Sequence, residues 1–412
     1  MILTARGRKV KNIKFLMIYA LIMLFFTGCS GSSVQEEDNN IIENNNEIEE
    51  VDKIKDKVES MSLEEKIGQL FIVGFEGEEI NDEIVDLVKN QKVGGLIYFS
   101  RNIVDSNQII NLNNEIKAIE KDIPLFISVD EEGGVVSRVP EEFVKLPSSG
   151  YIGQFNDENL SYNVGKIIAK ELNSLGFNMD FAPVLDIDSN PNNTVIGERA
   201  FGNNSEIVSR LGIKTMEGIK DGKIIPVVKH FPGHGDTDVD SHYGLPIVKK
   251  TLEELENLEF IPFKNAIDNG ADVVMISSII LESIDNEYPA TMSKKVTTDI
   301  LRDSLGFDGV IATDDMTMGA IVDNYNLADA VIMSINAGSD LVLVCHGYDD
   351  IINSIVAVKD AVNSKIISEE KIDESVYRIL KLKDKYNVNN KIIGNDIDIE
   401  GINSEIKSLF NQ

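Results

Sequence analysis

The chain has 412 residues, a hydrophobic content of 42% and a formal net charge of −30 at pH 7. This apolar content is enough to bury a large core, which excludes a disordered protein. A surface this acidic repels polyanions, and no cluster of Lys or Arg lies beyond the N-terminal segment, so nucleic acid is excluded as a partner. The two cysteines, Cys29 and Cys345, are too few for a disulfide framework.

Residues 1–28 have the pattern of a secretory signal: a basic start, an apolar run from Phe15 to Phe26, and small residues at the end. The apolar run is short for a membrane span. The sequence Phe-Thr-Gly-Cys29 resembles a bacterial lipobox, although that pattern prefers Leu at Phe26. This predicts a signal peptide over 1–28, lipidation of Cys29 and anchoring to the outer face of the cell membrane. An uncleaved signal anchor is the alternative.

The segment 29–50 is rich in Gly, Ser, Asn, Glu and Asp, so it cannot bury apolar surface and is predicted to be a flexible tether. A single barrel domain is predicted over 51–390, with a polar C-terminal tail over 391–412. No internal repeat is found, and we expect a monomer.

Beyond the tether, short apolar runs alternate with amphipathic stretches, and Ser62–Glu65 has the pattern of a helix-opening capping box. The runs predict buried parallel strands at Leu70–Gly74, Gly95–Phe99, Leu125–Val129, Met179–Pro183, Ile225–Val228, Val273–Ser277, Val310–Thr313 and Leu341–Cys345. Crossover helices are predicted at Asn107–Lys121, Asn159–Leu175, Ser205–Asp221, Leu252–Asn269 and Thr297–Leu305. We therefore predict the α/β class and a single (β/α)₈ TIM-type barrel with an inserted catalytic loop. An open doubly wound sheet is the alternative.

The active site of such a barrel lies at the carboxyl ends of its strands. Asp130 follows the third run, within VDEEGGVVSR (129–138). A carboxylate there suits the hydroxyl groups of a sugar, and the Gly pair 133–134 would let backbone approach a ligand. A turn with surface acids is the competing interpretation, and it fits Glu131 or Glu132 better than Asp130.

The fifth run leads into the densest cluster, KHFPGHGDTDVDSH (229–242), which begins with Lys229 and His230. Asp240 and His242 are two residues apart, a spacing that lets a carboxylate hold an imidazole in a loop. Such a pair fixes one tautomer and raises the pKa of His above about 6.5. His242 is thus a candidate general acid and base, with Asp240 as its partner.

Two metal sites compete for this loop. His230, His234 and His242 could bind zinc, but their spacing matches no standard zinc motif. Asp236-x-Asp238-x-Asp240 fails as a calcium loop, because the required Gly and Glu are missing downstream. We expect no metal, and expect His234, Asp236 and Asp238 to hold the loop together.

The seventh run ends in Asp314, Asp315 and Met316. Asp314 could be a nucleophile or the N-cap of the following helix. We assign the nucleophile to Asp314 and a supporting role to Asp315.

Several motifs in fixed order resemble glycoside hydrolase family 3, specifically its bacterial β-N-acetylglucosaminidase branch. They are KHFPGHGDTDVDSHYGLP (229–246), VDEEGGVVSR (129–138), FAPVLDI (181–187), VIGERAFG (195–202), PATMS (289–293), GVIATDDMTMGAI (309–321) and AGSDLVLVC (337–345). The resemblance implies a nucleophile at Asp314 and an acid/base dyad at Asp240 and His242. It implies sugar-binding residues at Asp130, Arg138, Arg199, Lys229 and His230.

The sequence departs from the family pattern at Glu131, where Gln is frequent, at Val135, where Arg is frequent, and at Ser277-Ser278, where many members carry His. These departures put contacts to the leaving group in doubt. The resemblance implies a retaining exo-β-N-acetylglucosaminidase without a cofactor. With the export signal, it points to cell-wall saccharides containing N-acetylglucosamine as substrates. A β-glucosidase, an N-acetylglucosaminide phosphorylase, a metal-dependent hydrolase and a non-catalytic sugar-binding lipoprotein are the alternatives.

Overall fold

A computed structural model describes residues 52–410, except 238–240, 242–243 and 395. The predicted signal peptide, tether and lipidated Cys29, as well as Asp240 and His242, lie outside the described residues. The described residues from Asp52 onward form one compact unit. Within the described part of the chain, no helix is long and apolar enough to cross a membrane.

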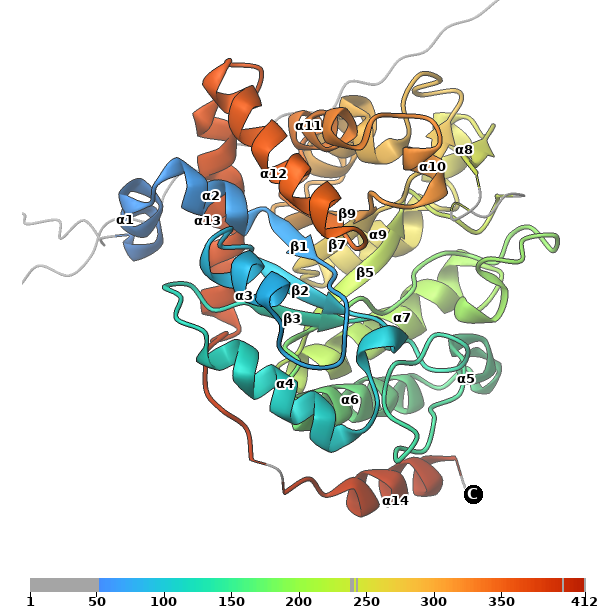
Figure 1. Ribbon diagram of the computed structural model, residues 1–412. Coiled ribbons are helices and arrows are strands. Elements are labelled where there is room, and N and C mark those ends of the chain that lie inside the picture. The colour runs from blue at the N-terminus through green and yellow to red at the C-terminus, as the bar shows by residue number, and fades with distance from the viewer. Residues whose placement is uncertain (1–51, 238–240, 242–243, 395, 411–412) are drawn as a thin grey trace, which may run out of the picture. The chain divides into compact units, whose positions relative to one another are not determined.

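The central element is a closed barrel of parallel strands in the order β1-β10-β9-β7-β5-β4-β3-β2 (Figure 1). The strands are β1 (Phe71–Val73), β2 (Gly95–Tyr98), β3 (Phe126–Val129), β4 (Met179–Asp180), β5 (Ile225–Phe231), β7 (Val273–Ile276), β9 (Val310–Asp315) and β10 (Leu341–Val344). Each matches one of the eight apolar runs, and the predicted (β/α)₈ barrel is confirmed. A separate parallel pair, β6 (Ile247–Val248) and β8 (Ile280–Leu281), lies outside the barrel.

Helices surround the barrel and connect its strands (Figure 1). They are α1 (Lys53–Ser60), α2 (Leu63–Gln69), α3 (Asp82–Lys89), α4 (Ser106–Ala118), α5 (Ser149–Phe155), α6 (Glu158–Leu175), α7 (Ser205–Asp221), α8 (Leu252–Glu256), α9 (Phe260–Asp268), α10 (Gly319–Val322), α11 (Leu327–Ala337), α12 (Tyr348–Asn363), α13 (Glu369–Lys385) and α14 (Ile399–Leu409). Short 3₁₀ turns span Ser100–Asn102, Gly197–Arg199 and Ala290–Met292, and a π-helix spans Lys295–Ser304.

The predicted capping box opens α2. The Ser62 hydroxyl accepts the Glu65 backbone N–H at 3.3 Å, and the Glu65 carboxylate accepts the Ser62 N–H at 2.8 Å. Two otherwise unpaired donors of the first turn are thus satisfied, which fixes where the helix begins.

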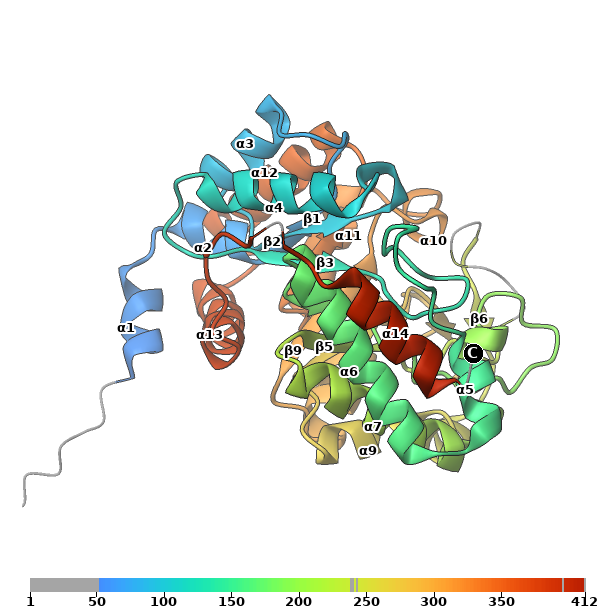
Figure 2. The same cartoon turned by 90° about the horizontal axis from the view of Figure 1, so that it is seen from below.

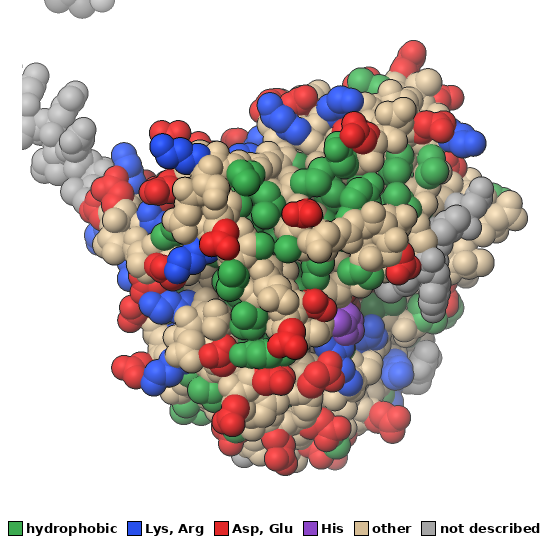
Figure 3. All heavy atoms as spheres, turned by 45° about the horizontal axis from the view of Figure 1, so that its top comes forward, with side chains coloured by type: hydrophobic (Ala, Val, Ile, Leu, Met, Phe, Trp, Pro, Cys, Tyr) green, Lys and Arg blue, Asp and Glu red, His purple; other side chains and the backbone are tan. Residues whose placement is uncertain are grey.

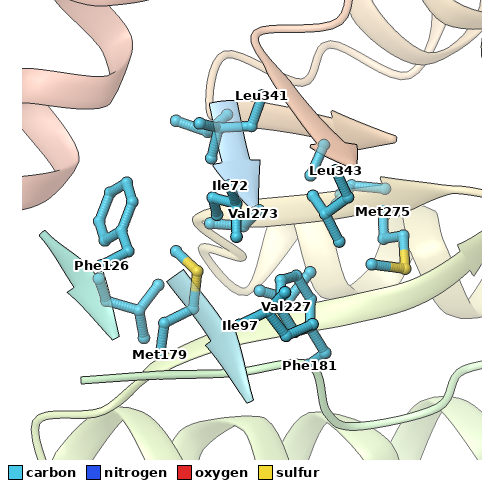
Figure 4. Packing of buried hydrophobic residues seen from close by; sticks show 14 of the residues in the cluster. Ile72, Ile97, Phe126, Met179, Phe181, Val227, Val273, Met275, Leu341 and Leu343 are labelled. Carbon is cyan, nitrogen blue, oxygen red and sulfur yellow. The ribbon is translucent and has the colours of Figure 1, made fainter. Parts of the chain in front are cut away.

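The barrel interior is filled by side chains that converge from its strands (Figure 4). Ile97, Phe126, Val227 and Leu341 are each 2% exposed or less. Because the strands are covered by helices outside and by these side chains inside, both faces are buried, which explains why they read as continuous apolar runs.

The C-terminal segment is more ordered than a polar tail. It contains α14, which lies along α6 (Figure 2). Ile402 and Ile406, one helical turn apart, are buried, and the Asn403 side chain bonds the backbone N–H of Val144 and the carbonyl of Glu142. These contacts attach α14 to the loop that follows β3.

The acidic side chains are distributed over the whole face drawn in Figure 3, with basic ones among them. This distribution agrees with a solvated acidic surface.

Candidate active site

A cavity of about 200 Å³ opens at the carboxyl ends of the barrel strands. The predicted site residues that the structure describes all line it: Asp130, Arg138, Arg199, Lys229, His230 and Asp314. A larger cavity of about 820 Å³ lies at the opposite end, beside the residues that precede β7 and β9. The smaller cavity is the candidate site, because barrel chemistry occurs at the carboxyl ends of the strands.

A chain of alternating charges forms one wall of this cavity. Lys229 Nζ, at the end of β5, lies 2.5 Å from Asp130 Oδ1 and 2.7 Å from Glu132 Oε1. Arg199 then grips Glu132 with two bonds, of 2.8 Å from Nε and 2.7 Å from Nη2. A bidentate pair of this kind fixes orientation as well as charge.

Glu132 and Lys229 remain charged although both side chains are buried. Burial raises the pKa of Glu132, but the positive charges of Lys229 and Arg199 outweigh burial and lower it to about 2. Burial lowers the pKa of Lys229, and the negative charges of Asp130 and Glu132 more than compensate, so that the pKa rises. Glu132, Lys229 and Arg199 are therefore ionised at neutral pH. Asp130, whose side chain is the most exposed of the four, lines the cavity.

The interpretation of Glu131 and Glu132 as surface acids is wrong. Glu131 is fully buried and Glu132 is 5% exposed. Their neighbours explain the burial: Glu132 bonds Lys229 and Arg199, and Glu131 bonds the far end of its own loop. Both partners of Glu132 lie far from it in the sequence, whereas those of Glu131 lie six to eight residues further along the same loop.

The glycines at positions 133 and 134 were predicted to let the backbone approach a ligand, but the structure gives a different reason for glycine at these positions. Gly133 and Gly134 have φ angles of 80° and 60°. A Cβ at Gly133 would lie 2.7 Å from the Pro147 carbonyl oxygen, and one at Gly134 would lie 2.6 Å from Ser148 Cβ. Glycine is required by backbone conformation and by packing within the protein.

The imidazole of His230 is held by Asp186, a residue that the sequence analysis did not single out. His230 Nδ1 lies 2.6 Å from Asp186 Oδ2, while Nε2 lies 3.5 Å from Arg199 Nη2. Asp186 Oδ1 also accepts the backbone N–H of His234 at 2.6 Å. Asp186 belongs to the FAPVLDI motif, and the motif was the only signal that could have found it.

His234 holds the catalytic loop together, in the way predicted for it. Its Nδ1 bonds the Thr237 hydroxyl at 2.9 Å and its Nε2 bonds the Ser241 hydroxyl at 3.2 Å. Both ring nitrogens of His234 are thus engaged, which argues against the zinc interpretation. The backbone carbonyl of Ser241 also accepts the Ala320 N–H at 3.0 Å, and Ser241 lines the cavity. Asp240 and His242, its neighbours in the chain, fall outside the described residues.

Asp314 lies near the end of β9 and lines the cavity opposite the loop after β3. Its Oδ1 accepts the backbone N–H of Asp315 at 2.8 Å. Asp315 also lines the cavity, but its carboxylate accepts bonds from the Thr317 N–H and hydroxyl and from the Cys345 N–H. Asp315 therefore ties the end of β9 to the residue after β10 and to the turn before α10, which leaves Asp314 as the candidate carboxylate for contact with a ligand.

Comparison with known proteins agrees with this geometry. Residues 62–382 match the glycosyl hydrolase family 3 N-terminal domain. The chain is 35% identical to β-hexosaminidase A of Pseudoalteromonas piscicida over 74% of its own length and 55% of that protein, so it spans about half of that relative. A β-hexosaminidase of Methylobacillus flagellatus is also 35% identical, over 66% of this chain and 79% of that one.

Among solved structures, a family 3 β-N-acetylglucosaminidase from Paenibacillus sp. superposes with a TM-score of 0.82 at 39% identity, covering 85% of this chain and 68% of that one. These findings confirm the resemblance carried by the motifs: the chain belongs to glycosyl hydrolase family 3.

Proposed function

We propose that this protein is a retaining exo-β-N-acetylglucosaminidase, which releases terminal β-linked N-acetylglucosamine through a covalent glycosyl-aspartate. The observation that carries the proposal is the placement of Asp314 in one small cavity with the charged chain of Asp130, Lys229, Glu132 and Arg199. The β-hexosaminidase relatives support the sugar class.

The size of the cavity supports removal of one sugar at a time. Pockets for drug-sized ligands measure about 300–1,000 Å³, and this one holds about 200 Å³. One sugar ring suits such a space better than the middle of a chain. Lys229 and Glu132, which are both buried, are part of its lining.

Fixed charges would hold the sugar. Asp130 is an acceptor for hydroxyl groups, and Arg199 and His230 stand beside it on the same wall. Since each of these side chains is already fixed by a protein partner, little reorganisation is needed when a ring binds, and the anomeric carbon is oriented toward Asp314.

Two displacements then follow. Asp314 attacks the anomeric carbon while protonated His242, paired with Asp240, gives its proton to the departing oxygen. The covalent ester between Asp314 and the sugar is next attacked by water, whose proton returns to His242. Here an imidazole takes the place of the second carboxyl of the usual retaining pair.

The predicted location of the enzyme limits the range of its natural substrates. The basic-then-apolar segment 1–28 followed by Cys29 would place the enzyme on the outer face of the cell membrane, tethered by residues 29–50. Its natural substrates would then be fragments of cell wall that end in N-acetylglucosamine.

The proposed specificity has a direct test. The enzyme should hydrolyse an aryl N-acetylglucosaminide on the order of 10²-fold or more faster, in kcat/KM, than the matching aryl glucoside. Initial rates with the two substrates measure the ratio. Equal rates would favour a β-glucosidase, and no hydrolysis of either would favour a binding protein.

The role of His242 is tested by leaving groups. His242→Ala should lower kcat/KM by about 10²–10⁴-fold for substrates with poor leaving groups, which need the proton. It should affect activated aryl glycosides far less in the glycosylation step. His346→Ala, which removes an exposed imidazole at the cavity edge, is the control and should not depend on the leaving group. An equal loss for both substrate classes in His242→Ala would contradict the acid role.

A further inference from the structure

Three carboxyl groups lie buried together beneath the loop that carries Asp130 and Glu132. Glu131 follows β3, Asp180 ends β4 and Glu171 lies on α6. Their exposed fractions are 0%, 0% and 1%. None of them lines the cavity, and the reaction described above does not use them.

Glu131 joins the two ends of this loop. Its Oε2 accepts the backbone N–H of Arg138 at 2.6 Å, the N–H of Val139 at 3.1 Å and the Ser137 hydroxyl at 3.0 Å. Its own backbone N–H donates to Asp180 Oδ1 at 2.9 Å. The positions of Asp130 and Glu132, on either side of it, therefore depend on how this one side chain is bonded.

The other carboxyl oxygens of these three residues, apart from Asp180 Oδ1, have no hydrogen-bond donor among the described residues. Glu131 Oε1, Asp180 Oδ2 and both oxygens of Glu171 are buried without a hydrogen-bond partner in the described part of the chain. Ionised carboxylates are acceptors only and cannot satisfy one another, whereas a protonated carboxyl carries one O–H donor. The unpartnered oxygens of Glu131, Asp180 and Glu171 can therefore form hydrogen bonds with one another only if at least one of these carboxyl groups is protonated.

The electrostatic surroundings also favour protonation of these carboxyl groups. Asp180 feels Glu131 and Asp130 as like charges and Lys229 as the opposite one, but Lys229 already pairs with Asp130 and Glu132. Burial raises the pKa of Glu131. Burial, together with the charge of Glu131, raises the pKa values of Glu171 and Asp180. Full ionisation would leave buried negative charge without compensation.

We infer that Glu131 is a positioning residue that acts in its neutral form: Oε2 holds residues 137–139, while Oε1 carries a proton toward Asp180 and Glu171. The sugar-binding loop keeps its shape while this proton is held.

The direction of the pH effect follows. A carboxyl whose pKa is raised by folding contributes stability below its ordinary value of 4.5, and this contribution is lost as pH rises through the folded-state value. Loss of the proton places negative charge next to Asp180 and Glu171 and loosens the loop. The Michaelis constant should then rise at alkaline pH through weaker sugar binding.

Glu131→Gln tests the inference, because the amide is neutral at every pH and always supplies an N–H. Glu141→Gln makes the same chemical change at an exposed position of the same loop and is the matched control. Infrared spectroscopy at neutral pH should show the carbonyl stretch of protonated carboxyl groups in the parent and in Glu141→Gln, and a weaker band in Glu131→Gln. Absence of the band from the parent overturns the inference without any variant.

The second measurement is the pH dependence of KM for an aryl N-acetylglucosaminide. KM should rise with pH in the parent and in Glu141→Gln, and stay flatter in Glu131→Gln. The unfolding equilibrium constant of the parent should rise with pH more steeply than that of Glu131→Gln, by up to about tenfold per pH unit for one proton. If Glu131→Gln follows the parent in KM, the positioning role is wrong. The KM measurement rests on the proposed function, whereas the infrared and unfolding measurements need no activity, so the two failures are distinguishable.

Discussion

Asp314→Asn should lower kcat/KM for an aryl N-acetylglucosaminide by about 10⁴-fold or more, the scale of loss when a nucleophile is removed. The amide keeps an oxygen that can accept the Asp315 N–H, so the backbone of β9 should remain in place. Steady-state rates measure the loss, and the thermal midpoint should stay close to that of the parent.

Labelling separates this role from a purely structural one. A fluorosugar that traps the glycosyl-enzyme should label the parent protein at Asp314, as peptide mass spectrometry would show, and should not label Asp314→Asn. Asp323→Asn makes the same change at an exposed position on the turn after α10, and it should be labelled like the parent. Full labelling of Asp314→Asn would place the nucleophile on another residue.

Among the substitutions proposed for this protein, Glu132→Gln should cause the largest decrease in the free energy of unfolding. It removes the carboxylate charge that pairs directly with two cations, the buried Lys229 and the half-buried Arg199. The pKa of Glu132 falls from 4.5 to about 2 on folding, which corresponds to about 3 kcal/mol of unfolding free energy at about 1.4 kcal/mol per unit. Breaking a buried pair costs about 3–5 kcal/mol by mutation, in agreement.

The pH dependence gives this prediction its sign. A lowered pKa contributes stability that is complete above the ordinary value of 4.5 and is lost as pH falls toward about 2. Denaturant unfolding should therefore show a wide gap between parent and Glu132→Gln at pH 7, and a much narrower gap near pH 2. Glu141→Gln should show no such gap at either pH. A gap that is constant with pH would mean that the charge of Glu132 is not its source.

The barrel could be predicted from the sequence because burial on both faces leaves a direct trace in it. Even β4, which is only two residues long, lies within the run Met179–Pro183. The helix α14 was not predicted, because its buried face consists chiefly of Ile402 and Ile406 in an otherwise polar segment. Their periodicity is too brief to distinguish a packed helix from a tail.

The sequence predicts which individual residues lie at the site, but not the contacts that those residues make with distant segments. Asp314, Lys229 and His230 follow apolar runs, which fixes their end of the barrel. The different surroundings of Glu131 and Glu132 could not be predicted, since they depend on Arg199 and Asp180, which lie about 50–70 residues further along the chain. Asp186 was missed for the same reason: it is 44 residues from His230 and meets it because β4 and β5 are neighbours. Asp240 and His242 stay predictions.

The carboxylate of Asp186 touches two parts of the site at once. One oxygen bonds the ring of His230, which lines the cavity, and the other bonds the backbone of His234, whose ring bonds the Ser241 hydroxyl. If His230 binds the sugar as proposed, we expect a shift of its ring to act through Asp186 on the segment that leads to His242, the proposed proton donor. We therefore expect a substitution at Asp186 to alter both sugar affinity and proton delivery, because both proposed roles depend on this one carboxylate.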